Sequence, residues 1–246
     1  MPEPIYAIGD VHGQLHMLED ALARIEKDGG PDAQVVFIGD YTDRGAHSRE
    51  VLDLLVKGKA EGKNWTFLRG NHDQMCAMFL EEYPRSDARL LVGYHWLHPR
   101  IGGVETLNSY GVEVSERDRI YQLHARAKAA VPQAHIDFLA NLLPYHLHED
   151  ILFVHAGIRP GVPLCHQDPN DLIWIREEFL DCPDPHPWLV VHGHTHVATP
   201  EHHGNRVNID TGAGYGEPLT AAVFEGSKCW LLRDEGRKPL TYIGSI

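Results

Sequence analysis

The chain of 246 residues carries 22 Lys and Arg against 35 Asp and Glu, a formal net charge of −13, and 43% of its residues are hydrophobic. This length suits one α/β domain with a buried core, so we expect a single domain over residues 1–246. The acidic balance argues against nucleic acid or an anionic membrane as a partner. No apolar run approaches the roughly 18 residues of a membrane span, and no signal sequence precedes the first apolar run, so we expect a cytoplasmic protein.

The first third of the chain alternates apolar runs with helical patterns. Residues 5–8, 35–38 and 65–68 are short apolar runs typical of buried strands. Between them, Leu15, Leu18, Leu22 and Ile25 recur at helical spacing, and a second helical pattern surrounds residues 51–55. Such alternation predicts an α/β fold in which helices cover a sheet and ligands bind beyond the carboxyl ends of its strands.

The rest of the chain divides into a helical part and a second group of strands. Residues 74–143 are predicted as a helical insertion, with helices at 121–130 and 134–143 and an interruption at the Gly-containing stretch 102–111. Its Met and aromatic residues are expected in the core rather than in a cap facing a substrate. Residues 151–154 and 189–191 are predicted strands, and residues 206–232 are predicted to form antiparallel strands.

Every predicted strand before residue 200 ends in a polar cluster. These clusters read GDVHG at 9–13, GDYTDRG at 39–45, GNHD at 70–73, HAG at 155–157 and GHTH at 193–196. One Gly-Asp pair alone is often only a turn or a helix cap. Five clusters, each closing a strand, indicate one shared site instead. Carboxylate, imidazole and amide ligands suit manganese, iron or zinc, and the scattered cysteines argue against a structural thiolate zinc site.

The order of these motifs resembles the calcineurin-like metallophosphoesterase superfamily, and specifically its bacterial phosphoprotein phosphatase branch, which is serine/threonine phosphatase-like. The discriminating element is Asp43-Arg44-Gly45, and the pattern from Trp96 to Gly111 also looks like bacterial members. The resemblance implies a four-layer α/β/β/α metallophosphoesterase sandwich. It also implies a dinuclear centre of two divalent metal ions, with manganese expected and iron or zinc as alternatives.

The resemblance implies a set of metal ligands. The first ion would be held by Asp10, His12 and Asp40, and the second by Asp40, Asn71, His155 and His194, so that Asp40 bridges the two. His196 corresponds to a further ligand of the first ion that many phosphoprotein phosphatases lack. His192 matches no ligand position and is expected to play a supporting role.

The same resemblance implies four catalytic residues. Arg44 and Arg176 correspond to two phosphate-clamping arginines, since a guanidinium pairs with phosphate oxygens in a planar fork; for Arg176 the alternative is a solvated helix start. His72 corresponds to a general acid oriented by Asp43.

Three activities fit these motifs. The favoured hypothesis is a serine/threonine protein phosphatase. The alternatives are a dinucleoside polyphosphate hydrolase acting on substrates such as diadenosine tetraphosphate, and a small-molecule or nucleotide phosphatase. A catalytically inactive binding module is disfavoured because every ligand position holds a competent residue. We therefore expect a phosphorylated protein or a small phosphate ester as the substrate, and the sequence leaves the oligomeric state open.

Overall fold

The fold contains two β-sheets, and the computed structural model describes residues 3–115 and 117–244. The first sheet has the order β11-β10-β9-β1-β2-β3 and the second the order β4-β5-β6-β8-β7. The strands of the first sheet are β1 (Ile5–Ile8), β2 (Gln34–Phe37), β3 (Trp65–Phe67), β9 (Ala221–Glu225), β10 (Lys228–Arg233) and β11 (Gly236–Pro239). Those of the second are β4 (Tyr145–His148), β5 (Ile151–Val154), β6 (Leu189–His192), β7 (Glu201–His202) and β8 (Arg206–Asn208).

The two sheets pack face to face across an apolar layer. Strand β1 illustrates how the sequence achieves this, because its side chains alternate between two faces. Ile5 and Ala7 belong to one buried cluster, together with Phe153 of the second sheet, whereas Tyr6 and Ile8 belong to another on the opposite face. Each face of the first sheet is therefore covered, which explains why its central strands read as continuous apolar runs.

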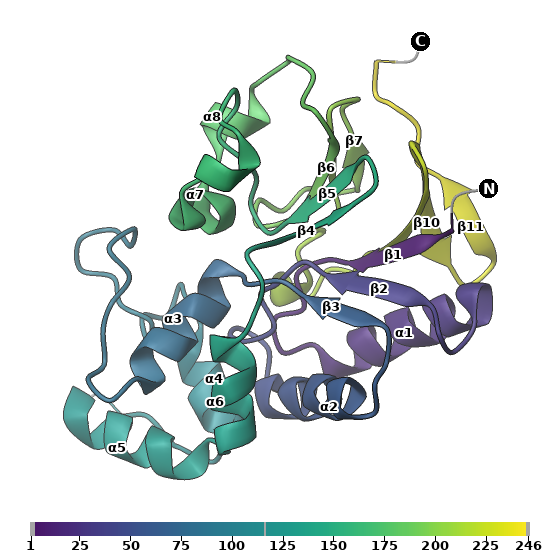
Figure 1. The fold of residues 1–246 in the computed structure, drawn as a ribbon. Coiled ribbons are helices and arrows are strands. Elements are labelled where there is room, and N and C mark those ends of the chain that lie inside the picture. The colour runs from purple at the N-terminus through teal and green to yellow at the C-terminus, as the bar shows by residue number, and fades with distance from the viewer. Residues whose placement is uncertain (1–2, 116, 245–246) are drawn as a thin grey trace.

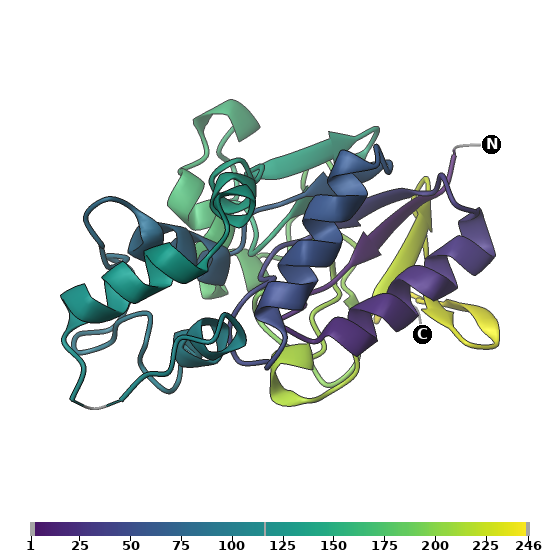
Figure 2. The same ribbon diagram turned by 90° about the horizontal axis from the view of Figure 1, so that it is seen from below.

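Helices cover the outer faces of both sheets. Helices α1 (Leu15–Gly29) and α2 (Ser48–Ala60) lie side by side across the first sheet (Figures 1 and 2). On the second sheet, α7 (Pro169–Trp174) and α8 (Glu177–Leu180) contribute Leu172 and Phe179 to a cluster with Leu152 and Val190. The order of layers is helix, sheet, sheet, helix, as the resemblance implied.

Between β3 and β4, the described residues form four further helices. They are α3 (Asn71–Leu80), α4 (Gly103–Ser109), α5 (Ile120–Ala130) and α6 (Gln133–Ala140). Met75 and Phe79 of α3 are buried in one cluster with Leu18 of α1 and Val51 of α2, as predicted for the Met and aromatic residues of the insertion. The prediction was wrong for Tyr83 and Tyr121, which are 76% and 58% exposed. The predicted interruption at 102–111 was wrong, because most of that stretch forms α4. Gly102, with φ of 94°, starts this helix, and Gly103 packs so closely on Trp96 that a side chain would collide with the indole.

The C-terminal strands are antiparallel only in part. Strands β9, β10 and β11 pair antiparallel, whereas β8 pairs antiparallel with β7 and parallel with β6, so the prediction for residues 206–232 is confirmed only in part for β8. The parallel pairing directs the residues after β8 toward the edge where β5 and β6 end.

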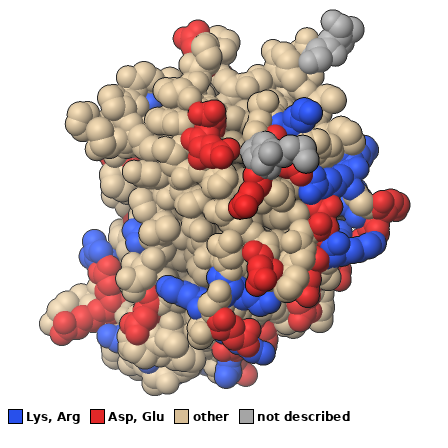
Figure 3. Space-filling model, turned by 45° about the vertical axis from the view of Figure 1, so that its right-hand side comes forward, with Lys and Arg blue, Asp and Glu red and all other residues tan. Residues whose placement is uncertain are grey.

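Within residues 3–115 and 117–244, no helix combines the length and the apolar run that crossing a bilayer requires. On the face shown in Figure 3, Lys and Arg lie among Asp and Glu rather than in one continuous basic surface.

Candidate dinuclear metal centre

The polar clusters of both sheets meet at one edge of the sandwich. The backbone N–H of His194, after β6, donates to the Asp10 carboxylate after β1, at 3.1 Å. His155, after β5, reaches across to the first sheet, where its Nδ1 lies 2.9 Å from the carbonyl oxygen of Ile38. The absence of a side chain on Gly193 lets the backbone before His194 lie close to Asp10, because a Cβ on Gly193 would collide with the Asp10 carboxylate. The carboxyl edges of parallel strands thus converge, as the sequence predicted.

Asp40 belongs to two groups of side chains with the spacing of metal ligands. One group is His12, Asp40 and His72, the other is Asp40, His155 and His194, and within each the ligand atoms lie within 4.8 Å of one another. The Oδ2 atom of Asp40 lies 3.5 Å from Nε2 of His12 and 3.5 Å from Nε2 of His155. This single carboxylate oxygen therefore stands between the two groups, where a bridging ligand would be.

The ring orientations of His12 and His155 fit metal binding. Each directs Nδ1 at a backbone carbonyl, Thr42 for His12 and Ile38 for His155, at 2.9 Å in both cases. A carbonyl only accepts, so each ring carries its proton on Nδ1 and presents the Nε2 lone pair to the centre. Backbone carbonyls commonly fix the tautomer of metal-ligating histidines in this way.

Around Asn71, atoms with lone pairs face one another. Asn71 Oδ1 lies 2.9 Å from Nε2 of His155 and 2.8 Å from Nδ1 of His194. With the His155 proton on Nδ1, its Nε2 and the amide oxygen are both acceptors, and a cation between them removes the repulsion. Such separations are those expected between ligands that share one ion at bond lengths of about 2.0–2.2 Å. Among the residues that the structure describes, none hydrogen-bonds to the buried Nε2 of His194. The residues present therefore fit two divalent cations.

Asp10 and His196 differ from the other expected ligands. Asp10 lies in neither of the two described groups, although burial and the charges of Asp210 and Asp40 raise its pKa well above the usual range. A buried carboxyl whose neighbours are also acidic is a position that a cation would stabilise. His196 is exposed and its ring lies against Tyr215, with centroids 5.1 Å apart. Its role as a ligand stays a prediction.

The backbone around the centre is strained. Six described residues other than glycine have positive φ, and five of them are site residues: His12, Asp40, Asp43, Arg44 and His194. Such conformations cost free energy in each case and persist only where the surroundings hold them in place.

Asp73 supplies part of that support. Its carboxylate accepts hydrogen bonds from the backbone N–H groups of Asp40 at 2.7 Å, Tyr41 at 2.9 Å and Gly70 at 3.0 Å. Sequence reasoning placed Asp73 in a motif and gave it no role.

His72 and Asp43 form a buried pair. Nδ1–H of His72 donates to Asp43 Oδ2 at 2.8 Å, and the carboxylate also accepts from Trp96 and Thr106. Burial raises the pKa of Asp43 to about 7, and the bonds from Thr106 and Trp96 act in the opposite direction. Burial likewise lowers the pKa of His72 to about 3; the charge of Asp40 raises it and that of Arg44 lowers it. Trp96 and Thr106 were noticed in the sequence only as part of a pattern.

The two predicted clamp arginines both lie at the centre. Arg44 donates to Nε2 of His12 at 2.9 Å and to Nε2 of His72 at 3.0 Å. Arg176 is exposed and donates to Thr195 at 2.8 Å, and its charge contributes to lowering the pKa of His194, after burial and His155. Two guanidinium groups therefore border a cluster of imidazoles and carboxylates, an arrangement suited to an anionic phosphoester bound beside cations.

Comparison with known proteins agrees with this geometry. Residues 3–214 match the family model of the calcineurin-like phosphoesterases. The chain belongs to this family. Its members use a dinuclear divalent metal centre, and the two groups that share Asp40 provide candidate ligands for one.

Relatives of this phosphoesterase include proteins named bis(5'-nucleosyl)-tetraphosphatase PrpE (asymmetrical). The one from Halalkalibacterium halodurans is 30% identical over 240 residues, which cover 88% of each chain. The one from Oceanobacillus iheyensis is 29% identical over 232 residues, covering 88% of this chain and 87% of the relative. A solved protein-tyrosine phosphatase from a Shewanella species shares the fold, with a TM-score of 0.63 and 17% identity over 98% of this chain and 81% of that one.

Asp210 is a residue of the phosphoesterase centre that sequence reasoning missed. It follows β8, is 5% exposed, and lies close enough to Asp10 and Asp40 to raise the pKa of Asp10 and to have its own raised, mainly by burial. Only the parallel pairing of β8 with β6 brings it to the edge. His192, by contrast, is buried against Phe179, with ring centroids 5.1 Å apart, and its supporting role stays a prediction.

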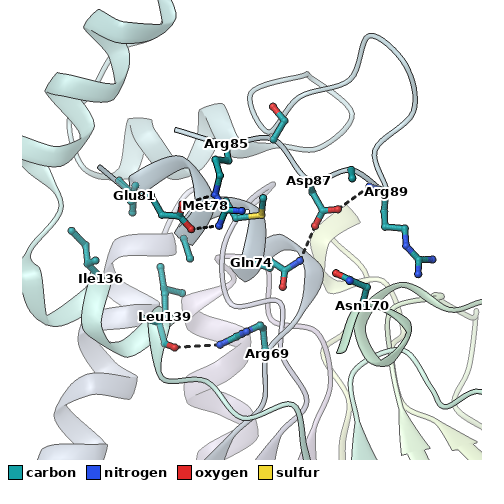
Figure 4. A pocket seen from close by; sticks show the side chains of 15 residues that line it. Arg69, Gln74, Met78, Glu81, Arg85, Asp87, Arg89, Ile136, Leu139 and Asn170 are labelled. Carbon is teal, nitrogen blue, oxygen red and sulfur yellow. Dashed lines mark hydrogen bonds and ion pairs between the residues drawn. The ribbon is translucent and has the colours of Figure 1, made fainter. Parts of the chain in front are cut away.

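Figure 4 shows a cavity of about 630 Å³. It is lined by Arg69, residues of α3 and α6, the segment 81–89 and Asn170, and by none of the residues predicted for the site. Three arginines border it, but Arg85 pairs with Glu81, Arg89 pairs with Asp171, and Arg69 donates to backbone carbonyls. Their charge and donors are already engaged, so the cavity is a weaker phosphate site than the centre around Asp40.

Proposed function

We propose that this phosphoesterase hydrolyses dinucleoside polyphosphates such as diadenosine tetraphosphate. The observation that carries the proposal is that two groups of candidate ligands share Asp40 and lie beside Arg44. In addition, a relative that covers 88% of this chain is named a bis(5'-nucleosyl)-tetraphosphatase. This activity was the alternative in the sequence hypothesis. It now replaces the serine/threonine protein phosphatase, because the solved protein-tyrosine phosphatase at 17% identity supports only the shared fold.

The proposed centre assigns each ligand as the sequence did. Asp10, His12 and Asp40 would hold one divalent cation, with His196 a candidate fourth ligand, and Asp40, Asn71, His155 and His194 would hold the other. Two such cations would supply Lewis-acid chemistry for the phosphoryl oxygens and for a bound water, whose pKa they would lower. Manganese is the proposed metal, since carboxylate, imidazole and amide ligands suit it.

The reaction consumes one water. An oxygen–phosphorus bond forms to the water oxygen, and one P–O–P bridge breaks, with the bridging oxygen leaving on the second nucleotide. Cleavage off the centre of diadenosine tetraphosphate yields ATP and AMP, whereas cleavage at the centre yields two ADP. Arg44 and Arg176 bind the nonbridging oxygens of the phosphate under attack.

His72 is proposed to assist the leaving oxygen. Asp43 holds its Nδ1–H, so Nε2 faces Arg44, which would bind the phosphate. A bound anionic phosphate would offset the charge of Arg44 and accept hydrogen bonds from its N–H groups, so that Nε2 takes up a proton from solvent and donates it to the leaving oxygen. A nucleoside phosphate is a stable anion, so its departure depends less on this proton than does the departure of a serine alkoxide.

A substrate panel tests the proposal. Purified enzyme, its metal content measured after loading with Mn²⁺, is assayed on diadenosine tetraphosphate, a phosphoserine peptide and a phosphotyrosine peptide, with nucleotide products separated by chromatography. We expect kcat/KM to favour diadenosine tetraphosphate by at least tenfold over either peptide, and Asp40→Asn to lack activity on all three.

The other outcomes overturn the proposal in different ways. A preference for the phosphoserine peptide would restore the protein phosphatase hypothesis. No turnover of any substrate by protein that holds two ions per chain would favour an inactive binding module.

A further inference from the structure

Tyr215 is an exposed aromatic residue at the rim of the metal centre. It ends the short helical turn η2 (Ala213–Tyr215), and 61% of it is exposed. The guanidinium carbon of Arg44 lies 4.7 Å from the centroid of its ring. Arg44 itself contacts His12 and His72, so one residue separates this ring from the reacting groups.

The turn that carries Tyr215 is held firmly against the centre. Gly212 and Gly216 adopt φ of 84° and 88°, and a Cβ on Gly214 would come within 2.7 Å of the His12 ring. The N–H of Gly212 donates to Asp210 at 2.9 Å. The turn therefore packs closely on the site, and it holds the Tyr215 ring in position before a ligand binds. An exposed ring that is already ordered loses little entropy when a ligand stacks on it.

The chemistry around Tyr215 fits a planar aromatic ligand joined to a phosphate. Arg44 offers the phosphate contact, Tyr215 stacks on the guanidinium, and the exposed His196 ring lies 5.1 Å away at an interplanar angle of 50°. No function described so far uses this exposed ring. Nucleobases bind aromatic platforms of this kind through their π-faces.

We propose that Tyr215 is a stacking site for one nucleobase of the substrate, with the adjoining phosphates on Arg44. This inference rests on the proposed function, since it assigns the nucleoside part of the same substrate class. The opposing interpretation is that the Tyr215 ring only supports Arg44, in which case every phosphoester would depend on it equally.

The test compares substrates with and without a base. Tyr215→Ala, Tyr215→Phe and wild type are assayed on diadenosine tetraphosphate and on phosphoserine, and adenosine is tested as an inhibitor of phosphoserine hydrolysis. Stacking on an aromatic side chain contributes about 1–3 kcal/mol per base, so Tyr215→Ala is expected to raise KM for diadenosine tetraphosphate roughly fivefold to 150-fold. The loss in kcat/KM should be at least about fivefold greater than for phosphoserine, and adenosine should inhibit more weakly. Tyr215→Phe, which keeps the ring, should retain the nucleotide preference and the inhibition.

A matched control is Tyr121→Ala, which removes an exposed tyrosine from α5. Equal losses on both substrates, with adenosine inhibition unchanged, would overturn the stacking site and favour support of Arg44. Wild-type kinetics in Tyr215→Ala would overturn it as well. If the wild-type enzyme fails to cleave diadenosine tetraphosphate, the proposed function is wrong. Weaker inhibition by adenosine in Tyr215→Ala would still support the stacking site in that case.

Discussion

The carboxylate of Asp73 contacts three backbone N–H groups in the turns that carry the bridging ligand. The residue is fully buried, and Asp40, Tyr41 and Gly70 donate to it. Asp73→Ala would leave these donors without an acceptor in a buried place. A buried hydrogen-bonding group left unsatisfied costs about 1–3 kcal/mol. We therefore expect the free energy of unfolding to fall by at least about 3 kcal/mol, the sum of the three smallest costs.

A second variant, Asp73→Asn, should lower the free energy of unfolding by less than Asp73→Ala does. Oδ2 of Asp73 accepts from Asp40 and Gly70, whereas Oδ1 accepts only from Tyr41. An amide in Asp73→Asn can keep its oxygen at the Oδ2 position and place its NH₂ against Tyr41, so its loss should lie between those of wild type and Asp73→Ala. Because Asp40 has φ of 54°, weaker support there should also reduce the metal content of both variants.

Urea denaturation of metal-depleted protein, followed by circular dichroism, measures the loss of stability, and elemental analysis measures the bound metal. Asp20→Ala is the control, since Asp20 is exposed on α1 and surface substitutions usually change stability by within about 0.5 kcal/mol. If Asp73→Ala loses less than about 1 kcal/mol, or retains full metal content, the reasoning from unsatisfied buried donors is wrong.

The remaining predictions concern the centre directly. Asp40→Asn should abolish turnover and reduce bound metal below two ions per chain; two retained ions, measured by elemental analysis, would contradict the bridging role. His72→Asn should lower kcat on phosphoserine by about 10²-fold or more, the usual range for general acid catalysis, with nearly normal metal content. Full turnover of phosphoserine by that variant would exclude His72 as the acid. Prolonged chelation should remove activity and lower the melting temperature, with Mn²⁺ restoring both, and activity that persists in protein shown to lack metal would refute a metal-dependent reaction.

Local patterns in the sequence predicted the α/β class and the neighbourhood of most site residues, whereas the four-layer sandwich was implied by the family resemblance. Apolar runs that end in Gly-Asp or Gly-Asn place Asp40 and Asn71 at strand ends, and parallel pairing then brings those ends together. The same logic placed His155 and His194 at the edge. The specific roles of the site residues stay predictions.

The residues that were missed depend on contacts distant in the sequence. Asp73 acts on backbone N–H groups more than thirty positions away, and no local pattern reveals such partners. Asp210 reaches the edge only because β8 pairs parallel with β6, and alternating apolar residues do not distinguish parallel from antiparallel pairing. The helix at Gly103 was missed because its two initial glycines are unfavourable for a helix by propensity, whereas packing on Trp96 requires one of them.

The centre takes its candidate ligands from both sheets, with Asp40 and Asn71 from one and His155 and His194 from the other. The sheets otherwise meet mainly through apolar side chains, whose attraction has no fixed direction. A cation bound jointly by Asp40 and His155 would act as a cross-link between the two layers and fix their relative register. The stability of the sandwich should then depend on the concentration of free metal, as expected for any ligand that binds only the folded state. In a cell, metal supply would therefore control how long the folded protein persists, in addition to its rate of turnover.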